Sequence, residues 1–266
     1  MKIAGSRILV TGASSGIGAA LAPQLAAAGA TVGIVARRAE RLEAVLDECR
    51  RHTPESRMWA ADLGDLDRAE AVALEAWDAF GGLDGLVNNA AIPDRIPVTK
   101  LTGERVAHVM DVDFHSPVRM SLAVMPRMIE RGSGMILFVS SMGGRIPIAN
   151  EAAYNAAKFA LCGWSEAMFL DLWGTGLEVK LVLPGPIDTE IWDQPGHEDA
   201  LFDVEKVPAA DCAAGIVAAI EDRGFEYYVP PVFPGGVDAK AVAVGVHQNC
   251  DGYLRGMAKF AHSARS

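Results

Sequence analysis

Tyr154 and Lys158 are the side chains whose types and spacing best suit proton transfer. They lie four residues apart in an Ala-rich stretch that is typical of a helix, so they share one face of it. A phenol has a pKa of about 10, which is too high for easy proton exchange at neutral pH. A neighbouring ammonium group lowers that pKa, which suits a general acid or base at a carbonyl or alcohol oxygen. A core tyrosine beside a surface lysine would have the same spacing, so the pair needs support from other motifs.

Two further segments lie where an α/β protein binds ligands. Ser141 follows a strand expected at 135–139, and Asn89 and Ala90 follow one expected at 84–87. The carboxyl ends of parallel strands form the ligand-binding edge of an open sheet. The Ser141 hydroxyl could donate to a substrate oxygen there, and the small residues would let a cofactor lie against the backbone. By itself, each segment would be an ordinary strand end or turn.

A glycine-rich run between a strand predicted at 8–10 and a helix that ends near Gly29 is typical of an anion-binding turn. Backbone N–H groups there can reach a phosphate, and the helix dipole favours negative charge. Gly12 permits the turn, Gly16 lets the backbone approach a pyrophosphate, and Gly18 lets the helix pack closely on the strand. The run lacks the Gly-Lys-Ser/Thr ending of a P-loop.

Strands and helices are expected to alternate along the chain. Further strands are expected at 31–36, 57–60, 84–87, 135–139, 177–183 and 227–229, and helices at 39–52, 66–80, 102–129, 150–173 and 209–221. This order predicts an α/β fold with one doubly wound parallel sheet of about seven strands and helices on both faces. Pro117 is expected to bend the 102–129 helix, because proline lacks the N–H and clashes with the preceding turn.

One domain is expected over 1–266, with a C-terminal tail at 230–266. In this tail Tyr253, Leu254, Met257 and Phe260 recur at near-helical spacing, which favours a helix packed on the body over a lipid contact.

Composition excludes several classes of protein. The formal net charge of −10 argues against nucleic acid as a partner. The four cysteines lie far apart without a Cys-x-x-Cys, which indicates free thiols rather than disulfides or a metal site. No uninterrupted apolar run reaches about 18 residues, and the start of the sequence lacks the apolar core of a signal peptide. We therefore expect a cytoplasmic protein without a metal or a membrane span.

Taken together, these motifs resemble the short-chain dehydrogenase/reductase family of the Tyr-x-x-x-Lys type. The resemblance covers roughly residues 5–230 and includes Thr11-Gly-x-x-x-Gly16-x-Gly18, Asp62, Asn88-Asn89-Ala90, Ser141 thirteen residues before Tyr154, and Pro184-Gly185. It implies a Rossmann-like fold and an NAD(P)-dependent oxidoreductase that interconverts a carbonyl and a secondary alcohol. It also implies that Tyr154 is the general acid and base, that Lys158 tunes it and holds the nicotinamide ribose, and that Ser141 orients the substrate oxygen.

The same resemblance implies a cofactor site at the carboxyl edge of the sheet. Asp62 would hold the adenine edge, the Asn88 segment would pack on the adenine ribose, and Ile187 and Thr189 would bind the carboxamide and phosphates. The expected cofactor-binding residues are Gly12, Ser14, Ser15, Gly16, Ile17, Gly18, Arg37, Arg38, Asp62, Leu63, Asn89, Ala90, Tyr154, Lys158, Pro184, Gly185, Ile187 and Thr189.

The end of the 31–36 strand predicts NADP(H) rather than NAD(H). An acidic residue there accepts from both ribose hydroxyls of NAD, whereas a basic one accommodates the 2′-phosphate of NADP. The strand runs into Arg37 and Arg38, and no acidic residue occurs before Glu40. We expect Arg37 to be the main contact with the phosphate, and Arg38 to stack on the adenine or to assist. A solvated basic pair is the alternative.

Asp113 is a departure from the family pattern. The resemblance implies a fourth catalytic residue, an asparagine whose main-chain carbonyl holds a water that relays protons to the lysine, and Asp113 occupies its place. An aspartate is nearly isosteric with asparagine, but its ionised carboxylate donates no hydrogen bond. The main-chain role could survive this change.

The substrate is expected to be largely apolar. A lid over 190–208 contains Ile191, Trp192, Pro195, Leu201 and Phe202, and Met142, Ile146 and Pro147 follow the catalytic serine. A polar anchor could come from Asp94, Arg95, Arg145 or His197.

Two long helices predict that the protein forms an oligomer. The 102–129 and 150–173 helices carry surplus apolar residues: Val109, Met110, Phe114, Val118, Trp164, Met168, Phe169, Leu172 and Trp173. Because the corresponding helices form the family's subunit interface, we expect a homo-oligomer, a tetramer or a dimer.

The alternative function is a nucleotide-binding sensor or structural protein with little turnover. An enoyl reductase is disfavoured, because that branch of the family spaces its Tyr and Lys more widely.

Overall fold

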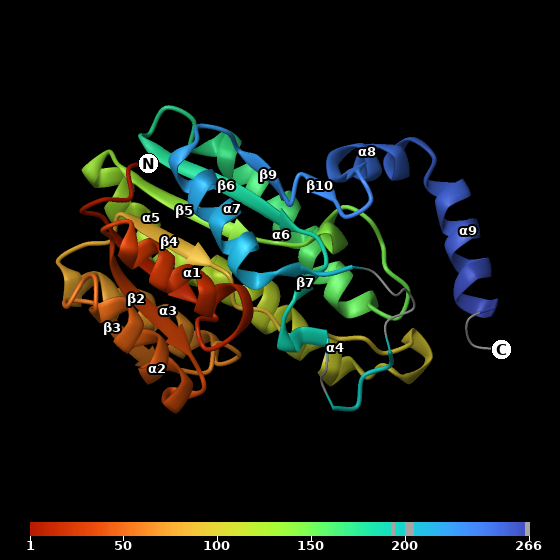
Figure 1. Ribbon diagram of the computed structural model, residues 1–266, viewed down its shortest axis with the longest axis horizontal. Coiled ribbons are helices and arrows are strands. Elements are labelled where there is room, and N and C mark those ends of the chain that lie inside the picture. The colour runs from red at the N-terminus through yellow and green to blue at the C-terminus, as the bar shows by residue number, and fades with distance from the viewer. Residues whose placement is uncertain (193–194, 200–204, 264–266) are drawn as a thin grey trace.

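Seven parallel strands form the central sheet of the computed structural model, which describes residues 1–192, 195–199 and 205–263 (Figure 1). The strand order is β3-β2-β1-β4-β5-β6-β9. The bounds are β1 Arg7–Thr11, β2 Thr31–Ala36, β3 Arg57–Ala60, β4 Gly85–Asn88, β5 Gly134–Val139, β6 Leu177–Pro184 and β9 Glu226–Val229. This confirms the predicted Rossmann-like sheet. The strand order reverses between β1 and β4, where such sheets bind ligands.

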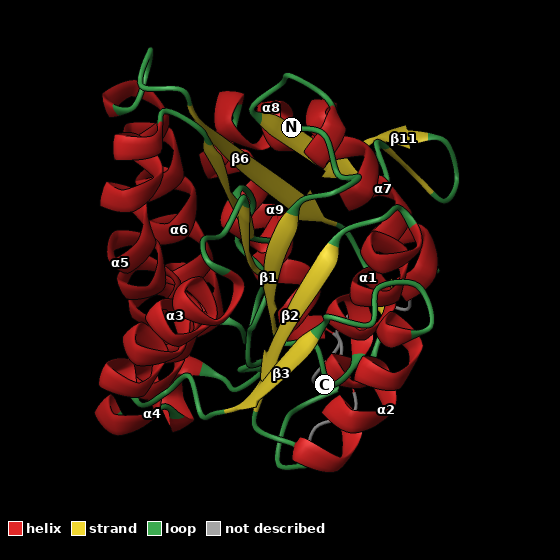
Figure 2. Ribbon diagram, turned by 90° about the vertical axis from the view of Figure 1, so that its left-hand side faces the viewer, coloured by secondary structure: helices red, strands yellow, loops and turns green. Residues whose placement is uncertain are grey.

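Helices cover both faces of the sheet, as Figure 2 shows. One face packs against α1 (Gly16–Ala27), α2 (Ala39–Arg50) and α7 (Ala209–Glu221). The other packs against α3 (Leu66–Phe80), α5 (Ser116–Arg131) and α6 (Ala152–Asp171). The strands supply apolar side chains to both layers in alternation: in β1, Ile8 and Val10 join the first layer and Leu9 joins the second.

The helix predicted at 102–129 is interrupted in the structure. It consists of α4 (Gly103–Met110), a π-helical segment at Asp111–His115 and then α5. Pro117 sits in the first turn of α5, and its missing N–H is the one that an α-helix would direct at the carbonyl of Asp113. The irregularity therefore lies just before the proline, and it turns the Asp113 side chain into the interior, where it is 0% exposed.

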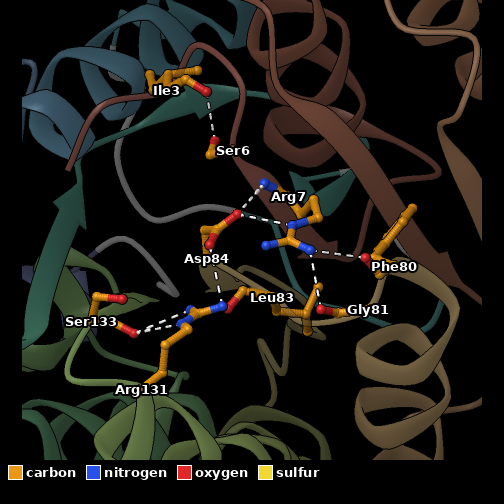
Figure 3. Close-up of polar contacts among 9 residues, drawn as sticks. All are labelled: Ile3, Ser6, Arg7, Phe80, Gly81, Leu83, Asp84, Arg131 and Ser133. Atoms are coloured by element: carbon orange, nitrogen blue, oxygen red, sulfur yellow. Dashed lines mark hydrogen bonds and ion pairs between the residues drawn. The ribbon is translucent and has the colours of Figure 1, made fainter.

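Charged side chains connect the elements at the edge of the sheet where the parallel strands begin (Figure 3). The Arg7 backbone N–H and Nε both donate to Asp84 Oδ2, at 2.9 and 3.1 Å. Arg131, at the end of α5, pairs with Asp84 Oδ1 at 3.3 Å and donates to the carbonyl oxygens of Leu83 and Ser133. The starts of β1 and β4 are thereby tied to the end of α5.

The C-terminal tail forms two helices, α8 (Ala239–Gln248) and α9 (Cys250–Ser263), preceded by the short pair β10 (Val232–Phe233) and β11 (Val237–Asp238). A second short pair joins β7 (Ile187–Asp188) to β8 (Val207–Pro208). Within the part of the chain that the structure describes, no helix is long and apolar enough to cross a membrane.

Candidate functional site

A cleft of about 950 Å³ opens at the carboxyl edge of the sheet. All of the predicted catalytic and cofactor-binding residues line it except Gly18 and Asp113. Gly18 packs beneath the turn, and Asp113 reaches the site through Lys158. Residues far apart in the sequence are thus gathered in one place by the parallel strands.

The glycine-rich turn between β1 and α1 is shaped for close contact. Gly12 has a φ of +70°, and a Cβ there would lie 2.7 Å from Ala90 Cα. A Cβ on Gly18 would lie 2.5 Å from the Gly12 carbonyl oxygen, so the helix start touches the turn. The Thr11 hydroxyl accepts hydrogen bonds from the backbone N–H groups of Asn89 (2.9 Å) and Ala90 (3.0 Å), which ties the turn to the end of β4. This cradle at a helix N-terminus fits the pyrophosphate of a dinucleotide.

The α6 helix presents Tyr154 and Lys158 on the wall of the cleft. The helix begins just after Asn150, which adopts a φ of +68°, a conformation that asparagine tolerates better than most residues. Lys158 is 1% exposed, and its Nζ lies 5.4 Å from the centroid of the Tyr154 ring and 3.4 Å from the Val139 carbonyl oxygen. Ser141, at the end of β5, hydrogen-bonds with Tyr154 and accepts from the Gly143 N–H at 3.0 Å.

Asp113 forms a buried ion pair with Lys158. Its Oδ2 lies 3.3 Å from Lys158 Nζ, and its Oδ1 accepts from the Ile92 N–H at 2.8 Å. Burial raises the pKa of the Asp113 carboxyl, while Lys158, the Ile92 N–H and the charge of His108 oppose that shift. The side chain therefore acts on the lysine directly, a contact that the sequence did not predict.

Several groups act on the pKa of Tyr154. Burial raises it most, and the negative charge of Asp113 raises it further, with Glu151 adding a smaller effect in the same direction. The hydrogen bond with Ser141 and the charge of Arg95 lower it. The net direction is upward, so the phenol is protonated at neutral pH in this arrangement.

Two arginines, Arg37 and Arg38, follow β2 and line the mouth of the cleft. Arg38 donates to the Ser15 hydroxyl at 2.6 Å and to the Ser14 hydroxyl at 3.3 Å, and it pairs with Glu190 at 2.9 Å. Arg37 also lines the cleft and is exposed. Arg38 thus contacts both serines, and the assignment of Arg37 as the main contact with a 2′-phosphate stays a prediction.

The predicted substrate end of the cleft holds both apolar and charged side chains. Met142, Ile146, Ile191 and Trp192 line it as expected. Of the four candidate anchors, Asp94 and Arg95 line the cleft, whereas Arg145 pairs with Glu166 and Glu226, and His197 contacts Arg105. Pro195 and Pro147 do not line it, and Leu201 and Phe202 lie outside the described residues.

Four residues that line the cleft were not predicted from the sequence to belong to the site. Tyr253 and Met257 of α9 line the cleft, and the Tyr253 hydroxyl donates to the Pro147 carbonyl oxygen at 3.1 Å. Glu151 and Phe233 also line it. The near-helical spacing of Tyr253 and Met257 predicted a helix packed on the body, and α9 is that helix, but the spacing did not indicate that this helix face lines the cleft.

The family model for short chain dehydrogenase matches residues 6–200. An uncharacterized oxidoreductase of Myxococcus xanthus is 37% identical over 188 residues, which cover 69% of this chain and 72% of that protein. A short chain dehydrogenase of Pseudocercospora fijiensis is 32% identical over 192 residues, which cover 71% of this chain and 62% of that protein. The match thus spans less than two thirds of the fungal relative's length.

A solved structure gives the same result. The short-chain dehydrogenase from Sphingobium yanoikuyae in complex with NADPH is similar to this chain with a TM-score of 0.80 at 27% identity, covering 96% of this chain and 95% of that one. The chain belongs to the short-chain dehydrogenase/reductase family, whose members are NAD(P)-dependent oxidoreductases acting on alcohols and carbonyls.

Proposed function

We propose that this chain interconverts a carbonyl and a secondary alcohol with NADP(H), and that Tyr154 is its general acid and base. The observation that carries the proposal is the buried Lys158 ammonium 5.4 Å from the Tyr154 ring centroid, at the wall of a cleft with Ser141 on the same wall. A phenol, an ammonium and a hydroxyl arranged this way suit proton exchange at one substrate oxygen.

Each residue has a task that follows from its chemistry. The glycine turn and the residues at the carboxyl edge of the sheet would hold NADP(H), which would supply or accept the hydride. The Ser141 hydroxyl holds the substrate oxygen beside the phenol. Tyr154 donates its proton to that oxygen when a carbonyl is reduced and removes a proton when an alcohol is oxidised. Lys158 stabilises the phenolate form, and Asp113 modulates that effect through its ion pair with Lys158.

The preference for NADP(H) over NAD(H) rests on the basic residues at the end of β2. An arginine can bind a phosphate through two parallel hydrogen bonds. Arg37 and Arg38 line the cleft beside Ser14 and Ser15, and no carboxylate precedes them to receive a ribose diol. The similar Sphingobium protein holds NADPH.

We also propose that the whole chain forms one dinucleotide-binding and catalytic domain, with 190–208 as the substrate lid and 230–266 as a tail that completes the cleft. The side chains of Met142, Ile146, Ile191 and Met257 support a substrate with a largely apolar body.

The test is the substitution Tyr154→Phe, which removes the proton and leaves the ring. Turnover of a panel of ketones should fall at least a thousandfold, roughly 4 kcal/mol of barrier. The dissociation constant of NADPH, measured by fluorescence titration, should change by less than about threefold, since at most one hydrogen bond is lost.

The matched control is Tyr228→Phe, at a partly buried tyrosine outside the cleft that packs against the core. It should keep near wild-type turnover. A Tyr154→Phe enzyme within about tenfold of wild type would show that another group moves the proton.

A further inference from the structure

A charged pair, Arg95 and Glu151, lies in the substrate wall of the cleft beside apolar side chains. Arg95 Nε donates to Glu151 Oε1 at 3.0 Å, and the two side chains are only 6% and 12% exposed. Arg95 follows the β4 segment, and Glu151 is the residue immediately before α6, three positions ahead of Tyr154. Both charges act on the pKa of Tyr154, in opposite directions, so the pair lies near the reacting group.

The protein holds the Arg95 guanidinium in place from several sides. Its Cζ lies 4.9 Å from the centroid of the Trp192 ring, and its Nη1 donates to the Trp192 carbonyl oxygen at 3.5 Å. The neighbouring Asp94 is bound by Arg105. The guanidinium is therefore positioned before any substrate enters, which lowers the cost of binding.

The pair keeps hydrogen-bonding capacity that the chain does not use. A guanidinium has five N–H donors, and across the described ranges Arg95 Nη2 and Glu151 Oε2 have no recorded partner. Asp94 Oδ2 is fully buried without a hydrogen-bond partner among the described residues. Arg95 Nη2 and Glu151 Oε2 are not buried in this way. A buried ion pair is costly to maintain, and here two of its polar atoms, unpaired within the described part of the chain, remain free to bind a group that enters the cleft.

We propose that the Arg95–Glu151 pair recognises a second, uncharged oxygen function on the substrate, a hydroxyl above all. This inference rests on the proposed function and names its substrate class: a hydroxylated ketone, or the corresponding diol, with an apolar body. A hydroxyl both donates and accepts, so it can satisfy Arg95 Nη2 and Glu151 Oε2 together.

The charge balance of the wall selects against an anionic group. Glu151 already neutralises Arg95, and a substrate carboxylate would meet the Glu151 carboxylate at the same place. Met257 and Ile146 line the same cleft and favour an apolar frame around the polar group.

The experiment compares cyclohexanones that carry a hydroxyl, a methyl or a carboxylate at carbon 3 or 4. The wild type should favour the hydroxyl over the equally sized methyl in kcat/KM by about tenfold, about 1.4 kcal/mol. The double variant Arg95→Met and Glu151→Met removes both charges at once, and its hydroxyl-to-methyl ratio should fall to about one. Replacement of a buried pair by apolar residues is often tolerated by the fold.

A second variant, Glu151→Gln, keeps an acceptor for Arg95 and removes the negative charge. It should raise kcat/KM for the carboxylate relative to the hydroxyl by about tenfold, because Arg95 then carries an uncompensated positive charge. A purely structural pair would not produce this switch. The matched control is Arg145→Met with Glu226→Met, another partly buried Arg–Glu pair, which should keep the wild-type ratio.

Binding is measured separately, by calorimetry on the Tyr154→Phe protein saturated with NADP. The hydroxylated ketone should bind about tenfold more tightly than the methyl ketone. Equal binding, or a hydroxyl preference that persists in the Arg95→Met and Glu151→Met variant, would overturn the inference. If the wild type reduces none of these ketones, the proposed function fails, and the calorimetric ratio still decides this inference.

Discussion

At the scale of single residues, the ion pair of Asp113 and Lys158 bears most directly on the proposed proton transfer. A lysine that helps a phenol to ionise is most effective when its positive charge is not already neutralised. Here a buried carboxylate lies 3.3 Å from Lys158 Nζ, and it raises the pKa of Tyr154. The same side chain accepts from the Ile92 N–H, so it also holds the segment after β4 in place.

The substitution Asp113→Asn should separate these two effects. The amide oxygen can still accept from the Ile92 N–H, so the fold should persist. Loss of the negative charge lowers the pKa of Tyr154, and alcohol oxidation requires the phenolate. The rising, acidic limb of kcat/KM for alcohol oxidation should therefore move to lower pH.

The control is Asp111→Asn, at another aspartate of the same π-helical segment without a recorded contact to Lys158. Its pH profile should match that of the wild type. An unmoved limb in Asp113→Asn would mean that the carboxylate exerts no electrostatic effect on Tyr154, and complete loss of activity would show that the charge itself is required.

At the scale of elements, the junction of β2 and α2 decides the cofactor. The Arg37→Asp variant places a carboxylate where a 2′-phosphate is expected, so it should repel NADPH and accept the ribose diol of NADH. The ratio of kcat/KM for NADPH over NADH should be above one in the wild type and should fall at least a hundredfold, about 2.7 kcal/mol.

Arg51→Asp makes the same change of charge at the far end of α2 and should leave the ratio within about threefold. A wild type that prefers NADH would contradict the assignment. An unchanged ratio in Arg37→Asp would leave Arg38, which already contacts both serines, as the candidate for phosphate binding.

The accuracy of the sequence predictions varies from element to element for physical reasons. The bounds of β2, β3, α3 and α7 agree with the structure residue for residue. Each is a short apolar or amphipathic segment whose ends are marked locally by turn residues, caps or proline. Pro117 predicted that the 102–129 helix would bend, and the structure interrupts that helix at Asp111–His115, just before the proline. The ion pair of Asp113 with Lys158 was not predicted, because it joins two residues that are 45 positions apart in the sequence.

In the candidate site, too, some residues could be predicted from the sequence and others could not. Tyr154, Lys158, Ser141 and the glycine turn could be placed from spacing, because each follows or forms a regular element. The pairing of Arg95 with Glu151 could not, since it joins residues 56 positions apart through side-chain geometry.

At the scale of the whole molecule, the surface apolar residues differ from those expected. Most of the nine residues singled out on the long helices pack within the chain; Val109, Met168 and Leu172 are buried, and only Trp173 among them is strongly exposed, at 77%. The outer faces of α5 and α6 instead expose Leu122, Phe159 and Leu170. We propose that this face, with Trp173, forms the subunit contact of a homo-oligomer.

The prediction is that sedimentation at micromolar concentration gives a mass of two or four chains. Leu170→Glu combined with Trp173→Glu should reduce it to one chain, because charges cannot be buried without partners. Val98→Glu alters a residue that is equally exposed, at 70%, but lies off these helices, and should leave the mass unchanged. A wild type with the mass of a single chain would contradict the prediction.

The fastening of the sheet by Arg7, Asp84 and Arg131 lies at the edge away from the chemistry. The enzyme can therefore be immobilised through the surface at this edge without blocking the cleft. The turn at 51–55 precedes the amino end of β3 and exposes His52 and Glu55. A linker attached there to a bead or an electrode would turn the mouth of the cleft toward the solution, so that substrate could diffuse in freely.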